Sequence, residues 1–238
     1  MLTSSQPLKD VFFCPEESNF YSHCLETLVL KNCFNSEAII EFGSGDGSPV
    51  IKSLLRTEFD GTIHGFELNS LACQVAKSKI KQYNLSDKYI IHNRSLFDSA
   101  KPEATYLVSN PPYLPALDNK IYQPLLHGGV EGITVTKQLL ALNCQNALVL
   151  VSSYSNPEGL INYALFNDYS VADFAISPMP FGYYSSETKV RDRIRELRRN
   201  NRAFYSDNIY LLAGVLFTKE SASTVDKSTE LVKLMTCL

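Results

Sequence analysis

The sequence predicts an α/β fold: one seven-stranded, mostly parallel sheet with helices on both faces and an antiparallel strand near the edge. Short apolar runs alternate with amphipathic segments along most of the 238 residues, which is typical of parallel strands joined by helices. The first apolar run ends in a glycine cluster, as a strand does when it turns tightly into a helix. The last two runs are separated by an arginine-rich segment and not by an ordinary crossover, which favours antiparallel pairing there.

The expected strands are short apolar runs with clear ends. In chain order they are Ala38–Phe42, Thr62–Phe66, Tyr89–Ile91, Tyr106–Val108, Ala147–Val151, Ser170–Ile176 and Ile209–Phe217. The expected helices include Leu25–Leu30, a helix that begins near Pro49, Ser70–Tyr83 and Thr134–Cys144. In an open sheet of this kind a ligand binds beyond the carboxyl ends of the strands, where the strand order reverses. The residues that follow the first four strands are therefore the candidates for a site.

No repeat, low-complexity tract or Gly/Ser linker divides the chain, so we expect a single domain over residues 1–220. That domain would include a short N-terminal helical segment, 1–37, and an arginine-rich helical insertion, 183–207. Residues 221–238 are polar and weakly patterned, so they are expected to form a partly mobile tail.

The composition indicates a soluble, cytoplasmic protein. The six cysteines form no Cys-x-x-Cys pair and no histidine lies at metal-ligand spacing, so we expect free thiols and no metal site. No apolar run approaches the roughly 18–20 residues that span a bilayer, and the N-terminus lacks the pattern of a signal peptide. The net charge of −3 argues against a surface coated in positive charge, although residues 187–202 alone carry +4.

A cofactor site is expected after the first two strands. Glu41 and Phe42 lead into Gly43-Ser44-Gly45-Asp46-Gly47, whose glycines let the backbone turn sharply and approach a ligand. Glu67 follows the second strand, where a carboxylate can accept both ribose hydroxyls of a nucleoside. These features fit a dinucleotide or an S-adenosyl cofactor. The G-x-G-x-G spacing and the acid at Glu41 favour S-adenosylmethionine, whose ammonium and sulfonium groups attract a negative charge.

The acceptor site is expected at Asn110-Pro111-Pro112-Tyr113, directly after the fourth strand. An amide or arylamine nitrogen is a poor nucleophile because its lone pair is delocalised. Hydrogen bonds from the NH₂ group to the Asn110 side chain and the Pro111 carbonyl would orient that lone pair toward the methyl group. The prolines stiffen the turn, and Tyr113 can stack on the planar group. We therefore assign these four residues to catalysis by positioning.

These motifs resemble those of the class I S-adenosylmethionine-dependent methyltransferases with an N-P-P-Y motif. Two further stretches resemble the branch that methylates protein glutamine, whose type substrates are translation release factors. Residues 11–18 are similar to its V-F-x-P-x-E-T/D segment, and residues 124–132 are similar to its A-L-x-G-G-x-D-G stretch. The resemblance implies a Rossmann-like methyltransferase fold. It implies cofactor contacts from Glu41, Gly43, Ser44, Gly45, Gly47, Glu67, Leu68, Ser95, Leu96, Asn110, Pro15 and Glu17.

The chain departs from that branch at both ends. Only about 37 residues precede the first strand, too few for the N-terminal helical domain of the bacterial release-factor enzymes. The insertion 183–207 carries Val190, Ile194 and Leu197 at helical spacing among its arginines. It is expected to be either a surface helix docked by that apolar stripe or a clamp, Arg191–Arg202, for RNA, DNA or an acidic protein.

The first hypothesis for the function is methylation of a protein glutamine amide, possibly in a translation factor. The second is N6-adenine methylation of RNA or DNA, and the third is N-methylation of a small molecule. A fourth is a module that binds cofactor or partner without turnover. The sequence does not distinguish the acceptors and leaves the oligomeric state open.

Overall fold

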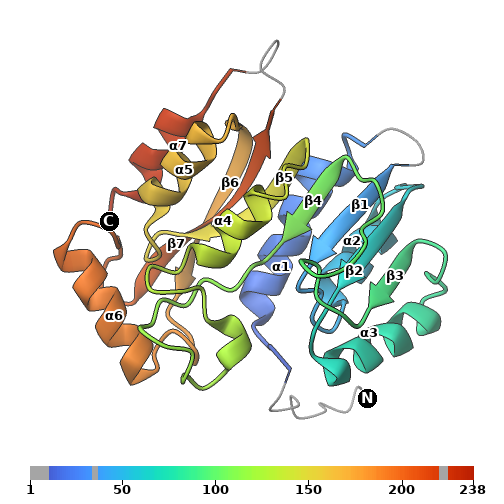
Figure 1. Cartoon of the computed structure of the whole chain (residues 1–238), viewed down its shortest axis with the longest axis horizontal. Coiled ribbons are helices and arrows are strands. Elements are labelled where there is room, and N and C mark those ends of the chain that lie inside the picture. The colour runs from blue at the N-terminus through green and yellow to red at the C-terminus, as the bar shows by residue number, and fades with distance from the viewer. Residues whose placement is uncertain (1–10, 34–36, 220–224) are drawn as a thin grey trace.

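The computed structural model describes residues 11–33, 37–219 and 225–238. Those residues form one sheet of seven strands between two layers of helices (Figure 1). The strands are β1 Ala38–Phe42, β2 Thr62–Phe66, β3 Tyr89–His92, β4 Tyr106–Ser109, β5 Asn146–Ser152, β6 Ser170–Pro180 and β7 Ile209–Thr218. The helices are α1 Pro15–Cys24, the π-helix η1 Leu25–Leu30, α2 Ser48–Arg56, α3 Ser70–Gln82, the 3₁₀ turn η2 Pro124–Leu126, α4 Thr134–Leu140, α5 Pro157–Phe166, α6 Thr188–Arg199 and α7 Ser228–Met235. Parts of the expected N-terminal segment and tail (1–10, 34–36 and 220–224) lie outside the described residues.

The sheet has the strand order β3-β2-β1-β4-β5-β7-β6. The pairs among β1 to β5 are parallel, whereas β7 runs antiparallel to both β5 and β6. The predicted seven-stranded sheet with a reversed strand next to the edge is thereby confirmed. The edge strand β6 contains Pro178 and Pro180, which an edge tolerates because one side of the strand needs no ladder hydrogen bonds.

The register of three strands brings the candidate site residues together. Phe42, the last residue of β1, pairs with Phe66 of β2 on one side and with Ser109 of β4 on the other. The residues that follow these partners are Gly43, Glu67 and Asn110. The strand order reverses between β1 and β4, so these three residues emerge at the topological switch point of the sheet.

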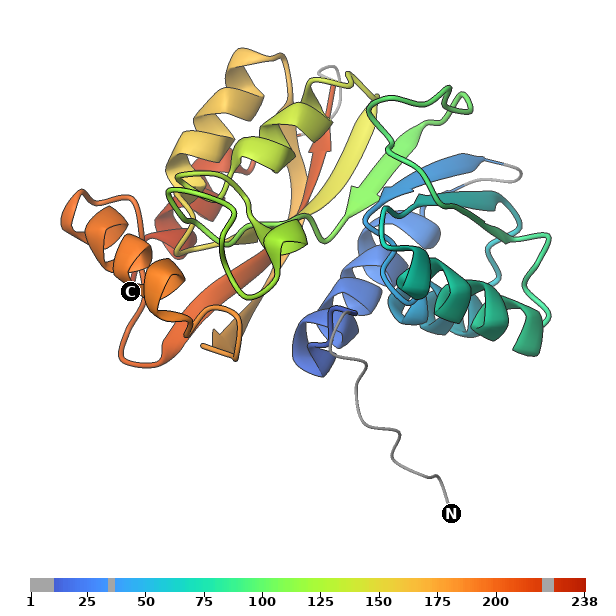
Figure 2. The same cartoon turned by 60° about the horizontal axis from the view of Figure 1, so that its bottom comes forward.

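The two helical layers bury separate apolar clusters. Tyr21 of α1, Leu54 of α2 and Ile80 of α3 belong to one cluster. Residues of α4, α5 and α7, among them Leu160 and Leu231, belong to the other. Figures 1 and 2 show α4 and α5 on the opposite side of the sheet from α1. The sheet is therefore covered on both faces, as a central strand such as β5, which is buried along its whole length, requires.

Helix α6 lies in the insertion between β6 and β7 and docks by its apolar stripe. Val190, Ile194 and Leu197 are all buried. Five of the six arginines in this region make contacts within the described chain. Arg193 and Arg195 pair with Glu196 and Asp192, Arg202 pairs with Glu131, Arg191 stacks on Phe181 and Tyr205, and Arg198 stacks on Tyr205. Much of the positive charge of this insertion is thus already paired within the chain.

The C-terminal region differs from the expected mobile tail. Ser228–Met235 form α7, in which Leu231 and Met235 are completely buried against α5 and β6. The pattern escaped detection because the helix is short and follows a polar segment, so its few apolar positions form no clear periodicity. None of the described helices is long and apolar enough to cross a membrane.

We expect Leu231→Ala to lower the free energy of unfolding by about 2–5 kcal/mol, because it leaves a cavity in a closed apolar cluster. Leu234 on the same helix is 41% exposed and provides the matched control. Leu234→Ala should stay within about 0.5 kcal/mol of the wild type. Chemical denaturation measures both changes, and equal effects of the two substitutions would contradict the docked position of α7.

Candidate functional site

The turn after β1 leaves open space for a ligand. Gly43, Gly45 and Gly47 have φ angles of +71°, +55° and +73°, a region that side chains with a Cβ disfavour. A Cβ added at Gly43 or Gly45 would meet no atom within 4 Å. Gly47 instead packs against Ala76 and Tyr89 and starts α2. The first two glycines therefore expose backbone toward the ligand, and the third closes the turn.

Glu67 is held in a fixed orientation beside this turn. Its Oε2 accepts a hydrogen bond from the Gly45 amide (2.8 Å), and its Oε1 accepts one from the Asn69 amide (2.7 Å). Asn69 in turn caps α3 through the amides of Leu71 and Ala72. A carboxylate has about four lone-pair sites, so Glu67 can still accept hydrogen bonds from the hydroxyls of a ligand. Backbone geometry thus presets the position of this carboxylate.

Glu41 is placed differently from its expected role at the cofactor. It is 1% exposed, and its carboxylate accepts hydrogen bonds from the hydroxyls of Tyr21 (3.2 Å) and Tyr89. Burial raises the pKa of Glu41 to about 7, against the hydrogen bonds that favour its charged form. The carboxylate is therefore bound by two tyrosine hydroxyls in the protein interior and does not form part of the wall of the cavity at this end of the sheet.

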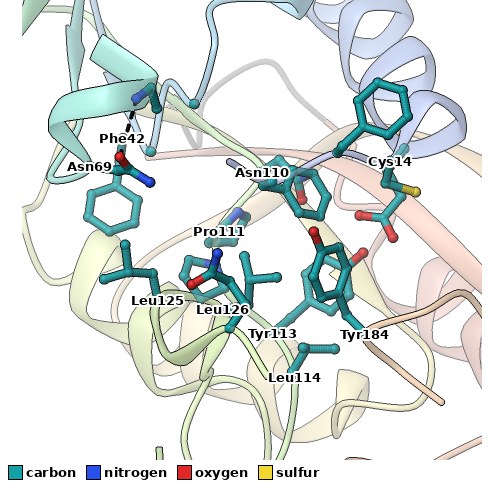
Figure 3. A pocket seen from close by; sticks show the side chains of 18 of the residues that line it. Cys14, Phe42, Asn69, Asn110, Pro111, Tyr113, Leu114, Leu125, Leu126 and Tyr184 are labelled. Carbon is teal, nitrogen blue, oxygen red and sulfur yellow. Dashed lines mark hydrogen bonds between the residues drawn. The ribbon is translucent and has the colours of Figure 1, made fainter. Parts of the chain in front are cut away.

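A cavity of about 360 Å³ lies at the carboxyl ends of the strands, and we call it the site cavity. Figure 3 shows Phe42 and Asn69 at one end and Tyr113, Tyr184 and Cys14 at the other, with Asn110 and Pro111 between them. Its volume is within the range of small-molecule sites, roughly 300–1,000 Å³. Asn110 therefore lies where the two ends of the site cavity meet.

Most predicted site residues line the site cavity. Those in its wall are Gly43, Gly45, Glu67, Leu68, Ser95, Leu96, Asn110, Pro111, Pro112, Tyr113 and Glu17. Glu41, Ser44, Gly47 and Pro15 do not line it. Pro15 begins α1, and Ser44 is buried where a Cβ at Gly65 would meet its hydroxyl at 2.3 Å. These four residues lie outside the wall of the site cavity, although cofactor contacts were expected from them.

The turn Asn110–Tyr113 is braced by the glycine-rich stretch 128–132. A Cβ at Gly128 would lie 2.7 Å from the Pro112 carbonyl oxygen, and one at Gly132 would lie 2.5 Å from the Tyr113 carbonyl oxygen. The Ser155 hydroxyl also donates to the Tyr113 carbonyl (2.7 Å). These glycines are needed because their backbone contacts the turn directly, and the turn is consequently rigid.

Asn110 carries an unpaired polar atom. Its Oδ1 is buried and has no hydrogen-bond partner within the described residues. An unsatisfied buried acceptor costs about 1–3 kcal/mol. A buried acceptor without a partner indicates that a ligand supplies the missing hydrogen-bond donor. A bound N–H group would remove this cost.

Aromatic residues that the sequence analysis missed form the far wall of the site cavity. Tyr154 stacks on Phe181 with ring centroids 5.4 Å apart and meets Tyr210 edge-on at 4.7 Å. Tyr113 contacts Tyr154 at 5.9 Å. Tyr154 follows β5 and Tyr210 lies in β7, and neither position stands out in the sequence. The sequence feature that could have indicated this wall is the pair of adjacent tyrosines, Tyr183 and Tyr184, which follow β6 and line the site cavity.

The wall and rim of the site cavity are apolar and acidic. The charged residues that line it are Glu16, Glu17, Glu67 and Arg94. Five of its residues are exposed large hydrophobics: Phe13, Leu68, Phe97, Leu125 and Tyr183. Patches of this kind around a cavity mark an interaction surface. A partner with an apolar surface fits this rim better than one that presents phosphates.

Comparisons with known proteins agree with the fold. No protein-family model matches the chain. A release factor glutamine methyltransferase from Thermosynechococcus vestitus is 30% identical over 113 residues, 42% of this chain and 38% of that protein. A ribosomal protein uL3 glutamine methyltransferase from Neisseria gonorrhoeae is 25% identical over 130 residues, 51% of this chain and 41% of that protein.

The matched regions thus span about two fifths of these curated relatives. Among solved structures, a putative RNA methyltransferase from Pyrococcus horikoshii superposes with a TM-score of 0.58 at 11% identity, over 90% of each chain. This likeness shows the fold, which is the Rossmann-like methyltransferase fold.

The buried Glu41 gives a testable pH dependence of stability. Its pKa is raised from 4.5 to about 7 in the folded state. Its contribution to the free energy of unfolding is therefore full below pH 4.5 and is lost as the pH rises through about 7. Glu41→Gln removes the titrating group. The free energy of unfolding of the variant minus that of the wild type should therefore increase as the pH rises from 4.5 to about 7.

Denaturation at several pH values measures the difference. Glu58→Gln, at an exposed glutamate, is the matched control for the same substitution on the surface. A pH-independent difference for Glu41→Gln would show that the carboxylate is not held as described.

Proposed function

We propose that this protein is an S-adenosylmethionine-dependent N-methyltransferase that methylates the side-chain amide of a glutamine in a protein substrate. The observation that carries the proposal is the buried, unpaired Asn110 Oδ1 at the junction of the two ends of the site cavity. An amide NH₂ group would supply the missing donor at this atom. The two curated relatives act on different proteins, a release factor and a ribosomal protein, but both are named for glutamine methylation.

The residues at one end of the site cavity fit the cofactor. The open space at Gly43 and Gly45 admits the methionine part, and the free lone pairs of Glu67 match the ribose hydroxyls. Leu68 and Leu96 supply apolar contacts for a planar base. Bound there, S-adenosylmethionine would supply an activated methyl group on a positively charged sulfur.

The residues at the other end fit a planar amide. Asn110 Oδ1 and the Pro111 carbonyl can each accept one N–H of the NH₂ group, and Tyr113 can contact its face. The new bond joins nitrogen to the methyl carbon, and the bond from that carbon to sulfur breaks with its electron pair left on sulfur. The extra proton on nitrogen then leaves to water. No general base is required, because orienting the nitrogen lone pair supplies much of the rate gain.

The charge around the site cavity favours a protein substrate over a nucleic acid. A flipped base brings its phosphates to the rim of such a cavity, where basic side chains normally neutralise them. Here three glutamates and one arginine line the wall, and the exposed rim residues are apolar. Most arginines of the insertion 183–207 are already paired with acids or aromatic rings.

Incubation with methyl-labelled S-adenosylmethionine and a lysate of the source cells tests the proposal. The label should be lost to protease and retained after nuclease. Complete enzymatic digestion should then release methylglutamine, because acid hydrolysis would destroy the amide. Label lost to nuclease alone would contradict the proposal and favour adenine methylation. Label that stays in small molecules would favour a metabolite acceptor.

Glu67→Ala should weaken the binding of S-adenosylhomocysteine by about 1.5–3 kcal/mol, the range for hydrogen bonds to a charged group. Calorimetry measures the dissociation constant, and Glu58→Ala, an exposed glutamate away from the site cavity, serves as the control. An unchanged dissociation constant for Glu67→Ala would remove this residue from the cofactor site.

Asn110→Ala should reduce methyl transfer by at least about 100-fold, because the acceptor nitrogen loses the group that orients it. The affinity for S-adenosylhomocysteine should stay within about fivefold, equivalent to roughly 1 kcal/mol. Initial rates of label incorporation and calorimetry give the two quantities. A collapse of cofactor binding would show that Asn110 serves the cofactor first.

A further inference from the structure

The insertion 183–207 is bound to the loop that follows the turn Asn110–Tyr113. That loop, residues 114–133, runs beside α6 (Figure 1). Four charged side chains of the insertion contact it. The contacts are Glu187 Oε2 with the amide of Tyr122 (2.6 Å), Lys189 Nζ with Asp118 Oδ1 (3.2 Å), Arg193 Nε with the carbonyl of Val130 (2.8 Å) and Arg202 Nη1 with the carboxylate of Glu131. The insertion therefore holds this loop at several points along its length.

The insertion is itself firmly attached to the sheet. Helix α6 docks through Val190, Ile194 and Leu197, which are buried. After α6, the Phe204 amide donates a hydrogen bond to the Ser153 carbonyl (2.9 Å), and the Ser153 hydroxyl donates one to the Phe204 carbonyl (2.7 Å). Ser153 directly follows β5. A segment that is packed at its middle and hydrogen-bonded near its end can fix the position of a loop that it contacts.

Glu131 is the residue at which the insertion, the loop and the acceptor end meet. Its Oε1 pairs with Arg202, and its Oε2 accepts a hydrogen bond from Asn156 Nδ2 (2.9 Å). Asn156 begins α5 in a left-handed conformation, with a φ angle of +44°. Its neighbour Ser155 donates the hydrogen bond to the Tyr113 carbonyl (2.7 Å). One oxygen of Glu131 thus binds the insertion, and the other binds the segment that holds the turn.

The backbone beside Glu131 makes a second connection to the same turn. Gly132 has a φ angle of +78°, and a Cβ added there would lie 2.5 Å from the Tyr113 carbonyl oxygen and 2.7 Å from the Ser155 Cβ. There is no free space at this contact to absorb a displacement. A shift of Glu131 would consequently move the turn as well, because closely packed backbones transmit strain.

We propose that Glu131 and Arg202 are positioning residues through which the insertion keeps Asn110 and the Pro111 carbonyl in the orientation that methyl transfer needs. The proposal rests on the proposed function and gives the arginine-rich insertion a part in it. Neither Glu131 nor Arg202 lines the site cavity, so both act through the turn. A misplacement of about 1 Å at a reacting group can slow a reaction roughly 100-fold.

The test variants are Glu131→Ala, Arg202→Ala and the double variant. Initial rates are measured with labelled S-adenosylmethionine and the protein fraction of the lysate as acceptor. The turnover number should fall at least about tenfold in Glu131→Ala and about threefold in Arg202→Ala, with the KM for the acceptor changed less. The double variant should match Glu131→Ala, because Arg202 acts through Glu131, whereas independent residues would multiply their effects.

Cofactor binding and a matched arginine supply the controls. The dissociation constant of S-adenosylhomocysteine should stay within about twofold in all three variants, since Gly43 and Glu67 lie at the other end of the site cavity. Arg195→Ala removes an arginine of the same insertion that pairs with Asp192 on its own helix. It should change neither the turnover number nor the cofactor affinity.

Hydrogen exchange read by mass spectrometry tests the proposal without activity. The Leu114 amide donates to the Leu126 carbonyl (3.2 Å), and the Gly128 amide donates to the Leu114 carbonyl (2.9 Å). Peptides that cover residues 113–132 should exchange at least about threefold faster in Glu131→Ala and Arg202→Ala, because these hydrogen bonds open more often when the loop is released. Peptides from α3 should exchange at the wild-type rate in both variants, and Arg195→Ala should alter neither region.

Wild-type exchange of residues 113–132 in Glu131→Ala would overturn the proposal. Unchanged turnover in that variant, or losses that multiply in the double variant, would overturn the positioning role. A loss of cofactor affinity as large as the loss of turnover would also overturn it, because it would show a general disruption of the site. Faster exchange in a protein that transfers no methyl group to protein would support the link from the insertion to the turn while the proposed function fails.

Discussion

The parallel register of β1 with both β2 and β4 is the constraint on which the rest of the site depends. Because Phe42 pairs with Phe66 and with Ser109, the strands β1, β2 and β4 end at the same level of the sheet. Gly43, Glu67 and Asn110 therefore come together although they are far apart in sequence. A shift of either strand by one residue would turn its side chains to the opposite face and disperse these groups. The apolar clusters on both faces fix this register.

The glycines and carboxylates near the site cavity show how the backbone presents these groups. Gly128 and Gly132 allow one loop to lie directly on the backbone of residues 110–113, which stiffens the acceptor end. Two backbone amides fix the position of Glu67, while Glu41 accepts hydrogen bonds from two tyrosine hydroxyls and Glu17 accepts one. Buried acids oppose folding unless they are hydrogen-bonded. The hydrogen bonds therefore offset part of the cost of burial and also hold these carboxylates in fixed orientations.

The parts of the fold and site that could be predicted from the sequence are those with a local signature. The apolar runs predicted all seven strands, and the turn after each strand predicted where Gly43, Glu67 and Asn110 lie. The burial of Glu41 was not predicted, because the hydroxyls of Tyr21 and Tyr89 that bind it come from distant segments. Tyr154 and Tyr210 were missed for the same reason: their contacts exist only after the sheet has formed. Helix α7 was missed because it is only eight residues long and its few apolar positions form no clear periodicity.

The central claim is that an S-adenosyl cofactor binds between the glycine turn and Glu67 with its sulfur facing Asn110. A crystal structure of the protein soaked with S-adenosylhomocysteine tests this claim most directly. The account predicts ribose hydroxyls within hydrogen-bond distance of Glu67, the methionine part against Gly43 and Gly45, and the sulfur toward Asn110 Oδ1. A cofactor bound elsewhere, or no binding at a concentration of about 1 mM, which corresponds to roughly −4 kcal/mol, would contradict it.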